Sequence, residues 1–208
     1  AAVMVGRDRL FDLLRVEDLL VRKRKKYIRT TQSNHWLKKY KNLVKNTIPW
    51  RPEQVYVSDI TYIDTCEGFC YLSLITDMHS RKIVGWELSE SLSIEGSLHA
   101  LKKAIRETKD TQGVIHHSDR GIQYCSKAYV RMLKKNGMKV SMTEENHVYE
   151  NSLAERVNGI LKDELLLGER LQSYEVARKM VKEAIETYNN YRLHMSIDYM
   201  TPAAKHAA

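Results

Sequence analysis

Val55-Tyr56-Val57-Ser58-Asp59-Ile60-Thr61-Tyr62-Ile63 is the stretch of the sequence with the strongest strand character. It is dominated by β-branched and aromatic residues, which are typical of strands. Asp59 is in the same alternation phase as Val55, Val57 and Ile63, so its side chain shares their face of the strand. A carboxylate on an apolar face is costly to bury unless it is hydrogen-bonded, paired or bound to a cation. Asp59 is therefore the first candidate functional residue.

The sequence after this stretch predicts a meander followed by a crossover. Three antiparallel strands, separated by turns at Glu67-Gly68 and near His79-Ser80, are expected at Val55 to Asp64, Phe69 to Asp77 and Arg81 to Leu88. A helix that begins after Ser93 then leads to a short apolar run that ends at Asp119. This order is typical of a β-helix-β crossover.

The remaining segments complete an α/β pattern. A helix from Ser126 to Asn136-Gly137 precedes a fifth strand in which Met138, Val140 and Met142 alternate. A helix carrying Glu155 runs to about Gly168. A last helix starts at Ser173, with inward residues expected at Val176, Met180, Ala184 and Tyr188. Three strands, helix, strand, helix, strand and helices is the order of a ribonuclease-H-like fold, a five-stranded mixed sheet flanked by helices.

Two further acids accompany Asp59. Asp119 ends the run Gly113-Val114-Ile115-His116-His117-Ser118-Asp119. Glu155 belongs to a polar helical stripe of Asn151, Glu155, Asn158 and Lys162, at i, i+4, i+7 and i+11. Most such stripes are solvated helix faces, but here the stripe joins two acids on strands. Three acids, on a strand, a strand end and a helix, can converge on one cation.

These three acids lie in motifs that resemble a known family. The motifs are Ser58-Asp59-Ile60-Thr61-Tyr62-Ile63, His117-Ser118-Asp119-Arg120-Gly121-Ile122-Gln123-Tyr124, and the segment Tyr149 to Lys162 around Glu155. They resemble the Asp-Asp-Glu signatures of bacterial insertion-sequence transposases that share the retroviral-integrase catalytic core. The 35 residues between Asp119 and Glu155 are the family's usual gap. The resemblance covers roughly residues 50 to 205, with Tyr56 where the family commonly has Trp.

The resemblance implies an enzyme, a polynucleotidyl transferase that cuts element ends and joins the freed 3′-hydroxyl to target DNA. Two Mg²⁺ ions, for which Mn²⁺ substitutes, would stabilise the entering and leaving oxygens, and hard cations prefer carboxylate ligands. By resemblance Asp59 bridges the two ions, while Asp119 and Glu155 each hold one. The partners implied are element ends and target duplex, with the protein acting as a homo-oligomer on DNA.

Several other interpretations of the sequence remain open. A nuclease of the same fold that only hydrolyses DNA, or an inactive DNA-binding relic, would carry many of the same features. Cys66, Cys70 and His79 suggest a zinc site without an evident fourth ligand, and ordinary reduced cysteines are the commoner case. His116 and His117 are expected to pack beside Asp119 rather than to act directly. No tyrosine stands in an Arg-His-Arg-Tyr setting, which argues against a tyrosine recombinase.

Positive charge is concentrated at the start of the 208-residue chain. Residues 1–50 contain 13 Lys and Arg against 4 Asp and Glu, whereas residues 51–208 contain 21 against 22. The segment Pro49-Trp50-Arg51-Pro52 resists helix and predicts a boundary between a basic DNA-binding segment with its linker (1–50) and a catalytic core (51–208). Phosphate contacts are expected from the basic run and from the Glu155 helix: Arg22, Lys23, Arg24, Lys25, Lys26, Asn158 and Lys162. Gln123 and Tyr124 also suit a DNA contact.

Composition excludes some classes of protein. No uncharged apolar run approaches the ~20 residues of a membrane helix, and Arg7, Asp8 and Arg9 do not suit a secretory signal. Three cysteines give no disulfide framework. The expected location is the bacterial cytoplasm, in association with the nucleoid when the protein is bound to DNA, without a membrane partner.

Overall fold

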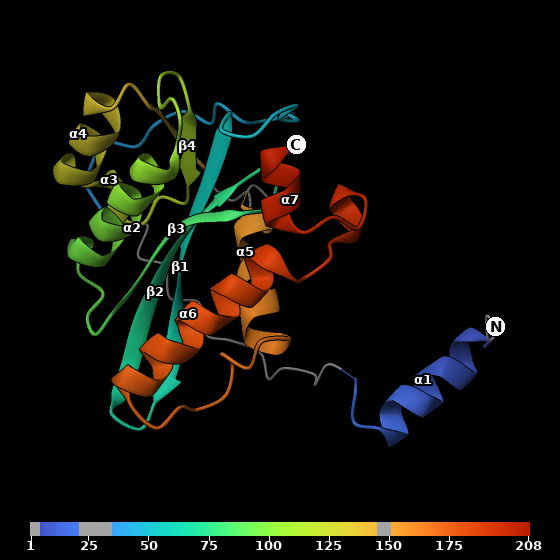
Figure 1. Ribbon diagram of the computed structural model, residues 1–208. Coiled ribbons are helices and arrows are strands. Elements are labelled where there is room, and N and C mark those ends of the chain that lie inside the picture. The colour runs from blue at the N-terminus through green and yellow to red at the C-terminus, as the bar shows by residue number, and fades with distance from the viewer. Residues whose placement is uncertain (1–4, 21–34, 145–150) are drawn as a thin grey trace.

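A mixed β-sheet forms the centre of the protein in the computed structural model, which describes residues 5–20, 35–144 and 151–208 (Figure 1). Five strands of this described part lie in the order β3-β2-β1-β4-β5. Their bounds are Val55–Thr65 (β1), Gly68–Asp77 (β2), Ile83–Ser89 (β3), Ile115–Ser118 (β4) and Lys139–Met142 (β5). The five-stranded mixed sheet expected from the sequence is confirmed.

The strand register decides where the acids lie. β1, β2 and β3 form an antiparallel meander, and β4 pairs parallel to β1 on the other side. The β1–β4 register places Ser58 opposite Ser118. Asp59 and Asp119 are the next residues along these two neighbouring strands, so the parallel pairing brings the two acids to the same level of the sheet.

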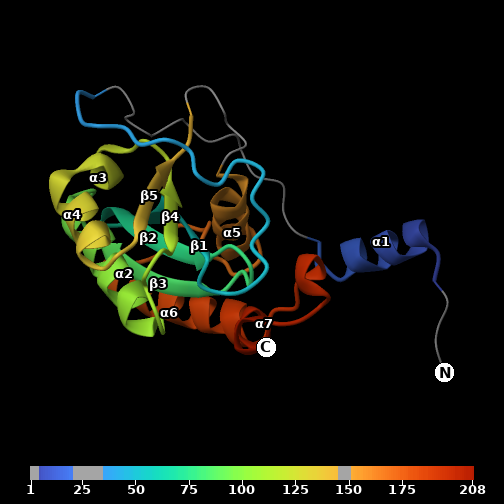
Figure 2. The same ribbon diagram turned by 90° about the horizontal axis from the view of Figure 1, so that it is seen from above.

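Helices cover both faces of the sheet. Figures 1 and 2 show α2, α3 and α4 on one side and α5 and α6 on the other. The bounds are Arg7–Val16 (α1), Ile94–Glu107 (α2), Ile122–Cys125 (α3), Lys127–Lys135 (α4), Ser152–Asp163 (α5), Tyr174–Asn190 (α6), Met195–Ile197 (the 3-10 helix η1) and Pro202–Ala207 (α7). Ser126 and Ser173 cap α4 and α6 as the sequence predicts, because each hydroxyl accepts a hydrogen bond from the backbone N–H three residues on.

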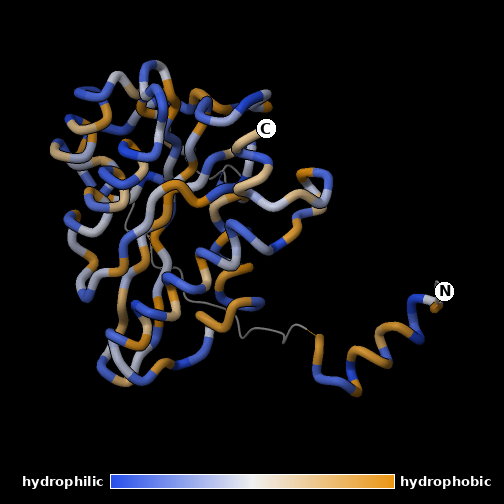
Figure 3. The backbone as a smooth tube through the Cα atoms, in the orientation of Figure 1, coloured by the Kyte–Doolittle hydropathy of each residue, from blue (hydrophilic) through white to orange (hydrophobic). Residues whose placement is uncertain are grey.

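Each face of the sheet has its own hydrophobic core. On the α5 and α6 side, Leu72 and Leu74 of β2 pack with Leu161 and Val181. On the other side, Tyr56 of β1 is fully buried among residues of α2 and α4, and its hydroxyl is hydrogen-bonded to Thr108 (2.8 Å). Figure 3 shows hydrophobic residues along the central strands. The tyrosine at the family's usual tryptophan position is therefore fully accommodated.

Residues 35–44 lie against the core. The backbone N–H of Leu43 donates to Ser141 Oγ (2.8 Å), and His35 Nε2 is hydrogen-bonded to the carbonyl of Arg120 (2.8 Å). Leu37 and Tyr40 pack on the second hydrophobic core. This part of the predicted N-terminal segment thus contacts β5 and the residue that follows Asp119.

Two expectations about helices are wrong. The Glu155 helix ends at Asp163 rather than near Gly168, because Leu166 adopts a left-handed conformation (φ 63°) and Gly168 N–H turns back to the carbonyl of Lys162 (3.0 Å). In α6, Val176 is 37% exposed. The inward stripe instead begins with Ala177 and Val181.

The N-terminal helix α1 stands apart from the sheet in Figure 1. None of its residues is buried, and it exposes Leu10, Phe11 and Leu13. Across the described ranges, no helix has both the length and the apolar character that are needed to cross a bilayer.

Leu161→Ala should lower the free energy of unfolding by about 2–5 kcal/mol, because Leu161 is fully buried between α5 and the sheet and the substitution leaves a cavity. Leu166→Ala is the control, since Leu166 is 59% exposed just beyond the same helix and should change stability by less than about 0.5 kcal/mol. Urea denaturation measures both, and equal losses would contradict the assigned core.

Candidate active site

Asp59 and Asp119 approach each other at the middle of the sheet. Asp59 is half-buried in β1, and its Oδ2 accepts a hydrogen bond from Asn158 Nδ2 (2.7 Å). Asp119 follows β4 directly, and its Oδ1 accepts from the backbone N–H of Gly121 (2.9 Å). A Cβ at Gly121 would lie 2.9 Å from that same oxygen, so glycine allows this tight turn. The turn fixes the direction of the Asp119 carboxylate.

The polar stripe of α5 faces β1. Asn151 Nδ2 donates to the carbonyl of Ser58 (3.1 Å), one residue before Asp59, and Asn158 reaches Asp59 itself. Glu155 lies between these two asparagines on the stripe and is exposed. The stripe predicted from helical spacing is therefore the surface that α5 presents to the acids of the sheet, rather than a fully solvated face.

The electrostatics place the three acids in one neighbourhood. Burial, together with the negative charges of Asp119 and Glu155, raises the pKa of Asp59 to about 7, against hydrogen bonds from the Ile60 backbone and Asn158 that lower it. Like charges and desolvation both disfavour the ionised form. The site therefore accumulates negative charge that a bound cation would relieve.

The donor atoms suit a hard cation, although the acids do not form a ready ligand set. Among the residues that the structure describes, no group of three or more His, Cys, Asp and Glu is placed to hold a metal ion. The side-chain oxygens of Asn151 and Asn158 are buried beside Asp59 without a hydrogen-bond partner in the described chain. Carboxylate and amide oxygens are the ligands that Mg²⁺ and Mn²⁺ prefer. The fold therefore places donors of the right kind beside Asp59.

The two histidines beside Asp119 belong to the packing. His116 Nε2 is hydrogen-bonded to Ser58 Oγ (2.7 Å) and to the Tyr129 hydroxyl (3.0 Å), and burial lowers the pKa of His116 to about 3, with His117 adding to the effect. His117 Nδ1 is hydrogen-bonded to Ser141 Oγ (2.9 Å). Both side chains are buried. Their expected packing role is confirmed, and sequence reasoning missed the Ser58–His116–Tyr129 network because its members are far apart in the chain.

Tyr124 lies closer to the acids than the sequence suggests. Its side chain is 3% exposed, so an outward DNA contact is wrong for this residue. Its hydroxyl has no hydrogen-bond partner within the described ranges, and burial raises its pKa well above the usual value, with further contributions from Tyr129, Asp59 and Asp119. Gln123 instead donates its amide to the Leu92 carbonyl (2.9 Å).

The residues expected to bind DNA divide into three groups. The basic run from Arg22 to Lys26 lies outside the described residues. Asn158 is 8% exposed and bonded to Asp59. Lys162 is 7% exposed on α5 and has interactions within the protein.

Cys66, Cys70 and His79, considered as zinc ligands from the sequence, do not form one cluster in the described structure. Cys70 lies near the start of β2, whereas His79 follows its end, and the His79 ring is hydrogen-bonded to the Pro49 carbonyl (3.0 Å). Asp77 serves the turn between β2 and β3, where its Oδ1 accepts from the Ser80 backbone (2.7 Å) and hydroxyl (2.8 Å).

The fold and the acids together define a ribonuclease-H-like catalytic core of the integrase type. Comparison with known families agrees, since two profiles described as "Integrase core domain" match residues 49–147 and 136–202. Among solved structures, a chain of the simian T-cell lymphotropic virus intasome is 18% identical and superposes with a TM-score of 0.66, over 84% of this chain and 61% of that one. The catalytic core of HTLV-2 integrase in complex with magnesium is also 18% identical. It superposes with a TM-score of 0.59, over 76% of this chain and 98% of that chain. These likenesses confirm the ribonuclease-H-like fold.

Curated relatives identify the family. The chain is 38% identical over 204 residues to the "Insertion element IS600 uncharacterized 31 kDa protein" of Shigella sonnei, covering 97% of this chain and 75% of that protein. It is 31% identical over 201 residues to the transposase for insertion sequence element IS629 of Shigella sonnei, covering 97% of this chain and 68% of that protein. Transposase InsF of IS3A from Escherichia coli K12 is 33% identical over 191 residues, covering 91% and 66%. The chain belongs to the insertion-sequence transposases with an integrase core domain, as its acidic motifs predict.

Asp59→Asn should stabilise the metal-free protein relative to wild type increasingly as the pH rises from about 4 to 7. The folded pKa of about 7 exceeds the ordinary Asp value of about 3.9, so in this window folded wild type keeps a proton that the unfolded chain has lost. Wild-type stability therefore falls with rising pH, whereas the substituted amide does not ionise. Thermal unfolding in EDTA across this pH range measures the difference.

Asp64→Asn, on the same strand but with its side chain 45% exposed, is the control for a general change in charge. If both variants followed the same pH dependence, the raised pKa would not belong to Asp59.

Proposed function

We propose that this protein cleaves the ends of an insertion element and transfers the freed 3′-hydroxyl into target DNA. The observation that carries the proposal is the placement of Asp119 and Glu155 near Asp59, where burial and then the negative charges of these two acids raise the pKa of Asp59 to about 7. Breaking a phosphodiester requires stabilisation of charge on the entering and leaving oxygens, which cations held by carboxylates provide. The membership in a transposase family supports the same reaction.

Two Mg²⁺ ions, or Mn²⁺ in their place, would supply the Lewis-acid chemistry. Asp59 would contact both, and Asp119 and Glu155 one each. The magnesium in the HTLV-2 integrase core supports a divalent cation. Asn158 holds Oδ2 of Asp59 and so sets the direction in which Oδ1 faces. Asn151 ties the start of α5 to β1, which keeps Glu155 beside the sheet.

DNA would be held by surfaces beyond the carboxylates. In this proposal residues 1–50 form a basic DNA-binding segment and linker, and residues 51–208 the catalytic core. The run Arg22 to Lys26 would neutralise phosphates. Asn158 and Lys162 would act near the reacting strand after local adjustment of α5. The intasome and the trimeric and dimeric forms among the structural neighbours support a homo-oligomer that acts on DNA.

A hydrolytic nuclease of the same fold is the second candidate function. It needs only water and one strand at the acids, whereas a transposase must keep a processed end while a second duplex arrives. An inactive DNA-binding relic is the third, and the intact acidic trio argues against it. The two enzymes differ in one measurable step, the joining of a pre-cut end.

Glu155→Gln should reduce both cleavage of an element end and joining of a pre-cut end by more than about hundredfold, because loss of a ligand costs more than loss of its outer-shell support. Gel assays with labelled element ends and Mg²⁺ or Mn²⁺ measure the two steps separately. Asp64→Asn, on β1 away from the acids, should leave both rates unchanged. Free hydrolysis by wild type without any joining would establish the nuclease instead.

Replacing Arg22, Lys23, Arg24, Lys25 and Lys26 with Ala should flatten the dependence of log K on log salt for duplex DNA. Each phosphate contact releases counterions, so the slope should fall by roughly one unit per lost contact. Fluorescence anisotropy over a salt series gives the slope. A slope equal to that of wild type would make the run an ordinary solvated surface.

A further inference from the structure

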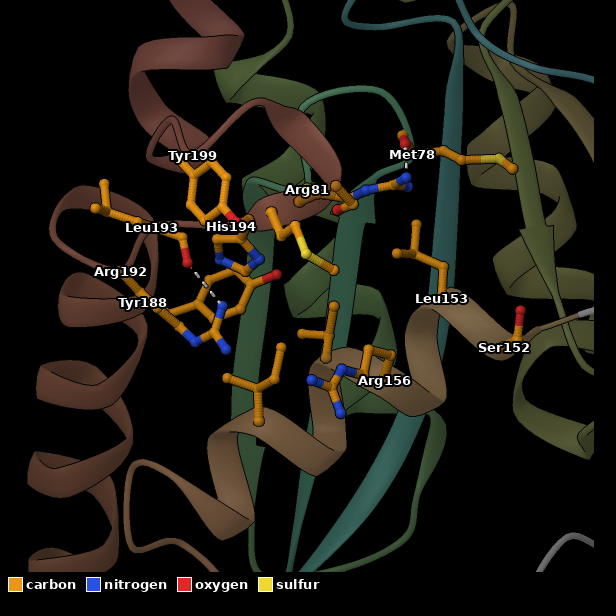
Figure 4. A pocket seen from close by; sticks show the side chains of 14 residues that line it. Met78, Arg81, Ser152, Leu153, Arg156, Tyr188, Arg192, Leu193, His194 and Tyr199 are labelled. Carbon is orange, nitrogen blue, oxygen red and sulfur yellow. Dashed lines mark hydrogen bonds between the residues drawn. The ribbon is translucent and has the colours of Figure 1, made fainter. Parts of the chain in front are cut away.

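A cavity of about 620 Å³ lies on the side of α5 next to Glu155 (Figure 4). Its walls come from the turn between β2 and β3, from α5 between Ser152 and Ile160, and from the end of α6 with the segment that follows it. Pockets of about 300–1,000 Å³ are typical of small-ligand sites. None of the acids of the candidate active site lines this cavity.

The lining is positively charged. Arg81, Arg156 and Arg192 reach the cavity from three separate elements, as Figure 4 shows, and the described lining contains no Asp or Glu. Arg192 is held by a two-point ion pair with Glu164 outside the cavity (2.7 and 2.8 Å). Arg156 is exposed and has no recorded hydrogen bond or ion pair within the described ranges. Arg81 donates from Nη1 to the Met78 carbonyl, while its buried Nε has no partner in the described chain.

A buried neutral histidine forms the floor of the cavity. His194 is 6% exposed, and its ring lies edge-on to Tyr188 with the centroids 4.9 Å apart. Burial, with a smaller contribution from the neighbouring Arg192, lowers the pKa of His194 to about 4. Its Nε2 has no hydrogen-bond partner among the described residues. An uncharged imidazole with one unused nitrogen can donate to a phosphate or accept from a base.

An exposed aromatic ring stands at the rim. Tyr199 is 65% exposed, and both it and Asp198 adopt left-handed backbone conformations (φ 57° and 58°). Two hydrogen bonds close this loop, from Tyr199 N–H to the His194 carbonyl (2.9 Å) and from His194 N–H to the Met200 carbonyl (3.1 Å). Strained non-glycine residues of this kind are often found at functional sites. The loop fixes an aromatic surface beside the arginines.

We propose that this cavity binds a single DNA strand, with one backbone phosphate between Arg156 and Arg81 and the adjoining base stacked on Tyr199. Guanidinium groups without acidic partners favour phosphate, and exposed aromatic rings favour bases, so the combination favours a nucleotide within a strand over a free anion. Because Arg156 follows Glu155 directly, a strand in the cavity passes along α5 toward the acids.

This inference rests on the proposed function in DNA transfer. It adds that the cavity binds an unpaired segment of the DNA substrate. A strand separated from its complement near the cut would fit. Met195 of the lining is itself exposed, as is Tyr191, which directly precedes Arg192.

Fluorescence anisotropy in EDTA with a labelled single-stranded oligonucleotide tests the site without chemistry. Arg156→Ala and Tyr199→Ala should each weaken binding about tenfold, and Arg156→Ala should lower the salt slope by about 0.7. Arg156→Lys and Tyr199→Phe should restore most of the affinity, because they keep the charge and the ring. Both positions are exposed, so these variants should fold, which circular dichroism verifies.

Arg106→Ala is the matched control, since Arg106 is an exposed helical arginine on the opposite face of the sheet and should bind as wild type. If Arg156→Ala and Tyr199→Ala also bind as wild type while wild type binds DNA and joins ends, the inference fails and the proposed function stands. If wild type binds no DNA, the proposed function fails first.

Competition by inorganic phosphate or a mononucleotide as strong as that by the oligonucleotide would reduce the cavity to a general anion site. Loss of a dimer by Arg156→Ala in gel filtration would make it a contact between copies.

Discussion

The parallel pairing of β1 with β4 is the constraint on which the candidate active site depends. Once Ser58 lies opposite Ser118, Asp59 and Asp119 occupy the same level of neighbouring strands. Burial and like charge then disfavour ionisation of Asp59, and the hydrogen bond from Asn158 offsets only part of that cost. A sheet interior that holds two carboxylates is tolerable when a cation neutralises them. The raised pKa of Asp59 is therefore a consequence of where the strand pairing places the two acids.

Helix α5 separates two regions of opposite charge. One side presents Asn151, Glu155 and Asn158 to the acids of the sheet, and the other side presents Arg156 to the arginine-lined cavity. Adjacent helical residues point about 100° apart, so one short helix can serve both regions. Its buried contacts through Val157 and Leu161 hold it on the sheet. The same apolar stripe that anchors α5 thus fixes the relation between the reacting centre and a strand-binding surface.

A buried hydrogen-bond network of Ser58, His116 and Tyr129 supports the strands that carry the acids. Ser58, immediately before Asp59, is hydrogen-bonded to His116 of β4, which also bonds to Tyr129 of α4. Burial keeps the pKa of His116 near 3, so the network stays neutral across the physiological range. Charge at the site can then change through the acids and their cations without loosening the strands that carry them. Sites held by such second contacts keep their geometry better than sites on loops.

Local sequence patterns determined much of the fold and of the candidate active site of this protein. Alternation in Val55 to Ile63 placed Asp59 on the correct face, the caps at Ser126 and Ser173 located two helices, and the 35-residue gap between Asp119 and Glu155 indicated the family. Such signals lie within one or two elements, where periodicity and turn chemistry act. The burial of Lys162, the early end of α5 and the outward position of Val176 were decided by packing. The cavity joins Arg81, Arg156, His194 and Tyr199 from segments far apart in the chain, and no local pattern relates them. Only the tertiary structure assembled it, because long-range contacts, unlike helix and strand periods, leave no repeating mark in the sequence.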